Sequence, residues 1–139
     1  MDLVTDLLVT LAYGGVGVAL MAVGYGLVDL ATPGRLRELI WVERNRNAAL
    51  LLTSNLAGVG IIVVAAIVSS EDDFVRGIVG AGVYGLLGLV IMAVAFLLLD
   101  MVTPGRLGEI LVDSDPHPAA WVSAVVHLAS GAIVAAAIS

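Results

Sequence analysis

The sequence predicts an all-α membrane protein with four transmembrane helices, built as two tandem helical hairpins. Hydrophobic residues make up 60% of the chain and charged residues 13%, with a mean hydropathy of +1.09, whereas soluble domains carry about 25% charged residues. The second half of the chain also repeats the first. The uncharged runs are each long enough to cross a hydrocarbon core of about 30 Å, and they cover residues 7–28, 47–70, 77–99 and 118–139.

The first and third runs carry the clearest part of the repeat. An offset of 71 residues maps Tyr13 onto Tyr84, and it maps the motif Asp-x-x-Thr-Pro-Gly-Arg at 29–35 onto the same motif at 100–106. Proline cannot continue a helix, and it disfavours helical geometry in the residue before it. We therefore expect these two helices to end near the threonines of the motif.

The second and fourth runs match at an offset of 72, which maps Ala57 onto Ala129 and Ile61 onto Ile133. The chain is then a single transmembrane domain, with repeat 1 at 7–70 and repeat 2 at 77–139. Because each repeat crosses the membrane twice, both copies enter from the same side. We expect parallel topology, with a pseudo-two-fold axis along the membrane normal.

Two connecting segments, 33–46 and 104–117, are expected to lie at the membrane interface. In the first, Leu36, Leu39, Ile40 and Trp41 alternate with arginines, a pattern typical of a short interfacial helix. A threonine before proline is a common N-cap, so Thr32 is a candidate cap for this helix.

The arginines predict the orientation. All six basic residues are arginine, and five of them lie in loops 32–46 and 103–117, against Arg76 alone in the middle loop. The positive-inside rule then places both loops in the cytoplasm, and both termini and residues 71–73 outside. With so few basic residues and no soluble domain, a nucleic-acid role is excluded. The absence of cysteine excludes disulfides and thiolate chemistry.

Small residues mark two helix faces as packing seams, because they allow close backbone approach in a bilayer. We favour packing within the chain for both faces, with self-association as the alternative. Four thin helices bury little surface, so a homo-oligomer is expected. The residues are Gly15, Ala19, Ala22 and Gly26 in the first helix and Gly77, Ala81, Gly85 and Gly88 in the third.

Asp29 and Asp100 are candidate polar membrane sites, since ionisable groups in membrane segments are costly and often functional. Symmetry could bring the two carboxylates together to share a proton or bind a cation. The alternative, which we favour, is a purely structural role at the helix ends. In it Arg35 or Arg106 folds back to neutralise the aspartate, while Thr32 or Thr103 adds a hydrogen bond.

Asn55 and His127 form a second candidate pair, because the offset of 72 places them at equivalent depth in the second and fourth helices. Histidine titrates near neutral pH and could relay a proton. Asparagine and histidine also serve as hydrogen-bonded glue between helices, and we favour that reading. In either case His127 should face protein, with Asn55, a serine or a water within hydrogen-bonding distance.

No hydrolase, nucleotide or metal motif is present, and two histidines alone cannot make a metal site. We expect no cofactor, no metal and no enzymatic activity.

The duplicated hairpin with Asp-x-x-Thr-Pro-Gly at 29–34 and 100–105 resembles a bacterial membrane family of unknown function, domain of unknown function 350, also called uncharacterised protein family 0719. The resemblance covers nearly the whole chain and implies a multi-pass protein of the bacterial inner membrane. It brings no catalytic or binding residues. It also suggests a context of envelope stress, and so a soluble envelope-stress partner.

Two functions remain open. The leading hypothesis is a small homo-oligomeric module for ion or proton permeation, with the aspartates and His127 as polar stations. The alternative is a structural or regulatory membrane partner in envelope maintenance, which docks anionic lipid or a soluble protein through its arginine-rich loop.

Overall fold

A computed structural model describes residues 2–70, 73–113 and 115–139. Residues 71 and 72 of the predicted outer loop lie outside this part of the chain. The described residues form six helices and no strand, which confirms the all-helical prediction. In chain order they are α1 (Leu3–Ala31), α2 (Leu36–Trp41), α3 (Arg46–Val68), α4 (Phe74–Val102), α5 (Leu107–Val112) and α6 (Pro118–Ile138).

The four long helices are the four predicted spans. Each is long and apolar enough to cross a membrane. Helices α1 and α4 extend beyond the uncharged runs at both ends, so Asp29 and Asp100 lie in their last turns. Thr32 and Thr103 are the C-caps of α1 and α4, as expected from the prolines that follow them.

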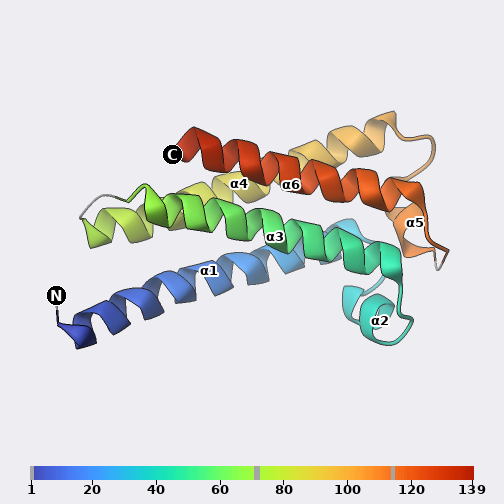
Figure 1. The fold of residues 1–139 in the computed structure, drawn as a ribbon. Helices are drawn as coiled ribbons and strands as arrows, with labels where there is room; N and C mark the ends of the chain where they lie inside the picture. The colour runs from blue at the N-terminus through green and yellow to red at the C-terminus, as the bar shows by residue number, and fades with distance from the viewer. Residues whose placement is uncertain (1, 71–72, 114) are drawn as a thin grey trace.

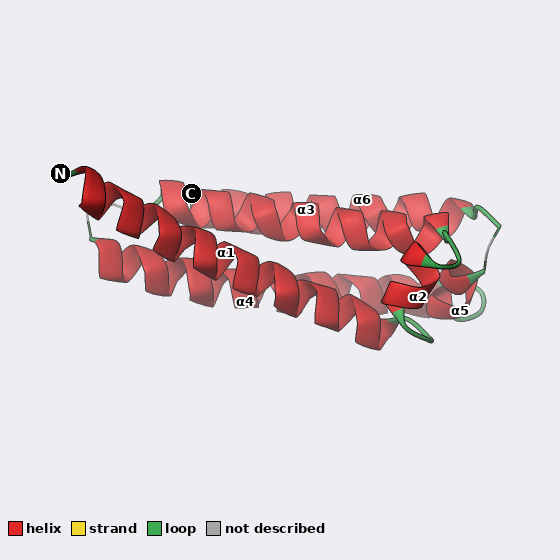
Figure 2. Ribbon diagram, turned by 90° about the horizontal axis from the view of Figure 1, so that it is seen from below, coloured by secondary structure: helices red, strands yellow, loops and turns green. Residues whose placement is uncertain are grey.

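Both termini lie at one end of the bundle, and α2 and α5 lie at the other (Figure 1). Helices α3 and α6 pack against each other more extensively than any other pair, and they run side by side in both views (Figures 1 and 2). Their closest approach needs glycine, because a Cβ on Gly131 would lie 2.7 Å from the Cα of Gly58. This contact between backbones holds the centre of the bundle.

The core contains two apolar clusters, one in each half of the bundle. The cluster nearer α2 and α5 includes Leu36, Leu51, Phe96, Leu107 and Leu111. The cluster nearer the termini is built from Leu20, Val59, Ile62, Val63, Leu89, Met92 and Val134. Along α3 and α6, the buried polar residues Asn55 and His127 fall between the two clusters.

The two predicted small-residue seams have different outcomes. On α4 the seam packs inside the chain: Gly77, Ala81, Gly85 and Gly88 are all buried, and Cβ atoms on Gly85 and Gly88 would collide with Leu20 and Ile62. On α1 the seam faces outward instead, and Cβ atoms on Gly15 and Gly26 would meet nothing within 4 Å. The expectation of internal packing is wrong for α1, because its buried residues, Leu20, Gly24 and Val28, lie on another face.

Candidate functional site

The first aspartate motif folds into a tight corner between α1 and α2. The Thr32 hydroxyl donates to the Val28 carbonyl at 2.6 Å, which ends α1. Gly34 then turns the chain with a φ of 90°, in the left-handed region that favours glycine. The turn brings the start of α2 back to α1, where the Leu36 backbone N–H donates to Asp29 Oδ1 at 2.8 Å.

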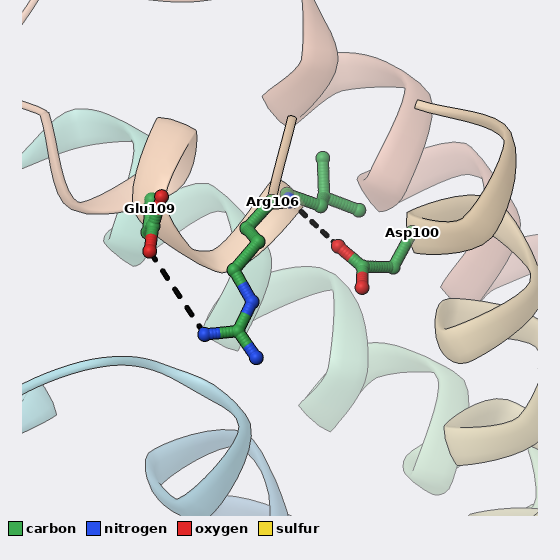
Figure 3. A network of polar contacts seen from close by, with 4 residues as sticks. Asp100, Arg106 and Glu109 are labelled. Atoms are coloured by element: carbon green, nitrogen blue, oxygen red, sulfur yellow. Dashed lines mark hydrogen bonds and ion pairs between the residues drawn. The ribbon is translucent and has the colours of Figure 1, made fainter. Parts of the chain in front are cut away.

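The second motif makes the same contacts between α4 and α5. Thr103 donates to the Leu99 carbonyl at 2.7 Å, and Gly105 also has a φ of 90°. The Leu107 N–H donates to Asp100 Oδ1 at 2.6 Å, and Figure 3 draws the bond to the Asp100 carboxylate as a dashed line. Each carboxylate therefore binds the first N–H of the short helix that follows its own long helix.

These contacts correct two expectations. Arg35 and Arg106 do not neutralise the aspartates, since the ion pair found among the described residues joins Arg106 to Glu109 at 4.0 Å (Figure 3). Thr32 does not cap α2 either, because its hydroxyl is used at the end of α1. The physical reason is geometric. The glycine turn delivers an unpaired backbone N–H to the carboxylate, while the Arg106 side chain is 81% exposed.

The geometry explains how a carboxylate is tolerated at the end of a membrane helix. It is unfavourable there because the carbonyl end of a helix carries partial negative charge, but the first N–H groups of the next helix carry partial positive charge. Both aspartates are half-buried. In the described part of the chain, no group of three or more histidine or acidic residues is arranged to hold a metal ion.

Two asparagines that the sequence analysis did not single out join the hairpins at this end. Asn45 caps α3 by accepting from the Ala48 N–H at 3.0 Å. Its Nδ2 also donates to the carbonyls of Val112 and Asp113 at 2.9 and 3.1 Å. Both asparagines are almost fully buried, at 2% and 3% exposure for Asn45 and Asn47.

Asn47 reaches the segment between α5 and α6. Its Nδ2 donates to the carbonyls of Asp113 and Asp115 at 3.1 and 2.8 Å, and its Oδ1 accepts from the His117 N–H at 3.1 Å. Asparagine before an apolar run is a recognisable N-cap signal, so the Asn45 cap was detectable from sequence. The partners of Asn47 were not, because they lie in the other hairpin.

His127 is buried and faces protein, as expected. It is 3% exposed, its Nδ1 lies 3.3 Å from Ser54 Oγ, and its ring stacks on Phe96 with centroids 5.9 Å apart and an interplanar angle of 18°. The partner is a serine of α3 rather than Asn55.

Asn55 has no such partner. The residue is 5% exposed, and its Oδ1 finds no hydrogen bond among the described residues. This oxygen faces α1, because a Cβ on Gly24 would lie 2.9 Å from it. Asn55 and His127 do line one cavity of about 290 Å³. The structure therefore gives the two predicted residues a shared cavity instead of a direct bond.

The family model described as "Domain of Unknown Function (DUF350)" matches residues 2–138. A UPF0719 transmembrane protein of Mycolicibacterium paratuberculosis is 35% identical over 130 residues, which cover 94% of this chain and 86% of the relative. UPF0719 transmembrane proteins of Mycobacterium bovis and Mycobacterium tuberculosis match with the same identity and coverage. No solved structure matches. The chain belongs to the DUF350 family of membrane proteins.

Proposed function

We propose that this member of the DUF350 family is a non-enzymatic structural or regulatory membrane module, whose α2/α5 end lies in the cytoplasm and docks anionic lipid headgroups. The observation that carries the proposal is which groups the charged side chains contact. The aspartates bind backbone N–H groups of their own chain. Four arginines of the first loop have no acidic partner within 4.0 Å among the described residues: Arg35, Arg37, Arg44 and Arg46.

The charge balance supports the α2 corner as the docking surface. Loop 32–46 holds four arginines and two glutamates, whereas loop 103–117 holds one arginine and three acidic residues. Arg35 and Arg37 line a surface groove with Tyr25, Glu38 and Trp41, so arginine outnumbers the one acid there, and Trp41 is 65% exposed. Arginine and tryptophan are the side chains expected at a headgroup region. The arginine count also supports the cytoplasmic placement in the bacterial inner membrane.

Quenching of Trp41 tests this docking. In a Trp121→Phe background Trp41 is the remaining tryptophan, and brominated phosphatidylglycerol should quench it at a lower mole fraction than brominated phosphatidylcholine. Arg35→Gln with Arg37→Gln should remove the difference, and Arg76→Gln at the other end should leave it. Equal quenching by both lipids in the unsubstituted background would contradict lipid docking and favour a soluble envelope-stress partner.

The proposal includes two tandem copies related by a pseudo-two-fold axis. Its support is that α4 and α5 begin and end 71 residues after α1 and α2, and that the carboxylate and threonine bonds recur at that offset. Superposing 13–40 on 84–111 should overlay the two carboxylates at one depth. A failure of that overlay would remove the symmetry from the proposal.

The proposal also includes a homo-oligomer formed through the outward small-residue face of α1, whose glycines meet nothing inside the chain. Small residues on an unpartnered face allow two membrane helices to approach closely. Ala22→Leu should lower the oligomer fraction measured by cross-linking in bilayers. Val23→Leu, on a different face of the same helix, should leave that fraction unchanged. If Ala22→Leu left the oligomer fraction unchanged, the contact between copies would lie on another face.

Ion or proton permeation is the second candidate, and the cavity shared by Asn55 and His127 favours it. The apolar cluster toward the termini argues against a path within one copy, so permeation would need a path between copies. We expect no proton flux above protein-free liposomes after reconstitution. Protein-dependent flux that His127→Asn abolishes would overturn the structural proposal in favour of this one.

A further inference from the structure

We infer that the cavity at Asn55 and His127 is a binding site for a lipophilic ring compound with a carbonyl or hydroxyl oxygen, the chemical class of the membrane quinones. This ligand site is independent of the docking function proposed above. It rests on four properties of one cavity: its polar groups, its aromatic wall, its size and its position.

The side chain of Asn55, one of the two polar residues that line the cavity, has no hydrogen bond among the described residues. Its Oδ1 is buried against Gly24 of α1, which does not line the cavity, so the group that Asn55 offers to a ligand is its amide N–H. A buried polar group without a partner costs a few kcal/mol, and more in a bilayer, where water is scarce. Native proteins rarely leave such a group without a water or ligand.

His127 adds an acceptor. The Ser54 hydroxyl donates to the Leu51 carbonyl at 2.9 Å, and Ser54 Oγ lies 3.3 Å from His127 Nδ1. Because the hydroxyl proton is used by Leu51, we assign the proton of the neutral imidazole to Nδ1. A neutral imidazole that donates from Nδ1 has an unprotonated Nε2. The pair therefore offers the Asn55 amide N–H as a donor and the unprotonated ring nitrogen of His127 as an acceptor. That set can bind a carbonyl oxygen or a hydroxyl group.

The rest of the lining selects an uncharged, flat molecule. Apart from Asn55 and His127 the cavity is lined by apolar residues, including Phe96, whose ring is stacked on His127. No arginine or other charged residue lines it, so a phosphate headgroup would have no counter-charge. Its volume is about 290 Å³, while a cavity of roughly 150 Å³ already binds benzene. A substituted six-membered or fused ring fits.

The position of the cavity selects a membrane-soluble ligand. It lies between the last turns of α1 and residues 89–97 of α4, and its walls include Leu30 and Leu97. These side chains are 85% and 60% exposed on the lipid-facing surface of the helices. A ring held at Asn55 can therefore extend an apolar tail between α1 and α4 into the bilayer.

The test uses the full chain in detergent micelles with ¹⁵N-labelled asparagine and a quinone carrying one isoprene unit as the probe. The chain has three asparagines, and Asn45 and Asn47 serve as internal references at the α2/α5 end. We expect the probe to shift the Asn55 side-chain amide resonance saturably and to leave the other two unchanged. The absence of a saturable shift at Asn55 would overturn the proposal and leave water as the occupant.

Blocking variants separate the cavity from general partition into micelles. Ala93→Phe fills the cavity from α4, and Ala31→Phe fills it near its mouth on an exposed position, so at least one should fold. In either folded variant the affinity for the probe, measured from the Asn55 amide shift, should fall at least tenfold. The matched control Ala129→Phe, exposed on α6, should keep it. Equal affinity in the blocked and control variants, or displacement of the probe by a short-chain phosphatidylglycerol, would contradict the site.

Discussion

The two ends of the bundle are held together by different means. At the α2/α5 end, two carboxylates and two buried asparagines bind backbone groups, and Asn45 and Asn47 connect one hairpin to the other. At the terminal end, a side-chain bond joins Tyr13 of α1 to Ser70, which follows α3, at 3.1 Å, and the first half of α1 has no buried residue. The contrast teaches that polar groups fix the arrangement at one end, while apolar contact and lipid hold the other.

The largest effect should come from Asn47→Ala at the α2/α5 end. It removes three hydrogen bonds of a side chain that is 3% exposed, and at about 1 kcal/mol each the free energy of unfolding should fall by about 3 kcal/mol. Reversible unfolding in mixed micelles measures this. Thr10→Ala, which loses a bond only within its own exposed helix, is the control. A loss of unfolding free energy smaller than that of Thr10→Ala would contradict the comparison between the two ends.

The aspartates should rank second. Asp29→Ala and Asp100→Ala each remove the charged acceptor of one backbone N–H, so each should lower the unfolding free energy by roughly 1.5 kcal/mol. Asp29→Asn and Asp100→Asn keep an acceptor oxygen, so each should lower the unfolding free energy by about half as much. The same unfolding assay checks the series. If the alanine variants were as stable as the parent, the carboxylates would not be structural.

Tyr13→Phe sharpens the comparison from the terminal end. It deletes the hydroxyl that contacts Ser70 but keeps the edge-to-face packing on Phe74, whose ring centroid is 5.9 Å away. The expected loss is about 0.5 to 1 kcal/mol. Thermal unfolding of Tyr13→Phe and of Asn47→Ala compares the stability that each substitution removes. Equal losses of stability would contradict the difference between the two ends.

The smallest effect should be that of Gly14→Ala. Gly14 is exposed, and a Cβ there would meet nothing within 4 Å. Alanine favours a helix over glycine by up to about 1 kcal/mol, so stability should stay constant or rise slightly. Gly85→Ala, where the Cβ would collide with Leu20, should lower it. A loss in Gly14→Ala would reveal a neighbour on that part of α1.

Much of this fold could be predicted from the sequence because the bilayer imposes simple requirements. Uncharged runs of membrane length predict the four spans, and proline after Thr32 and Thr103 predicts where α1 and α4 end. The partner of each aspartate could not be predicted. A carboxylate six residues before an arginine suggests an ion pair. Only the turn at Gly34 shows that the Leu36 backbone N–H, and not the arginine, binds Asp29.

The faces of α1 and α4 mark another limit of sequence reasoning. Both helices carry small residues at helical spacing, yet Gly85 is buried and Gly15 is exposed. Spacing identifies a face that permits close approach, but it does not say which neighbour approaches. In the same way, Asn47 could not be matched to the segment after α5, since its partners are backbone groups, which carry no signal in the sequence.

The reach of the asparagine bonds has a consequence for biosynthesis. The bond from the Leu36 N–H to Asp29 spans seven residues and can form as soon as the first corner has been made, whereas Asn47 donates to a carbonyl 68 residues later. At a synthesis rate of about 5–20 residues per second, the Asn47 amide waits roughly 3–14 s for that carbonyl to be synthesised. During that interval the Asn47 amide is left to water, and the bonds that join the two hairpins can form only once the second hairpin has been made.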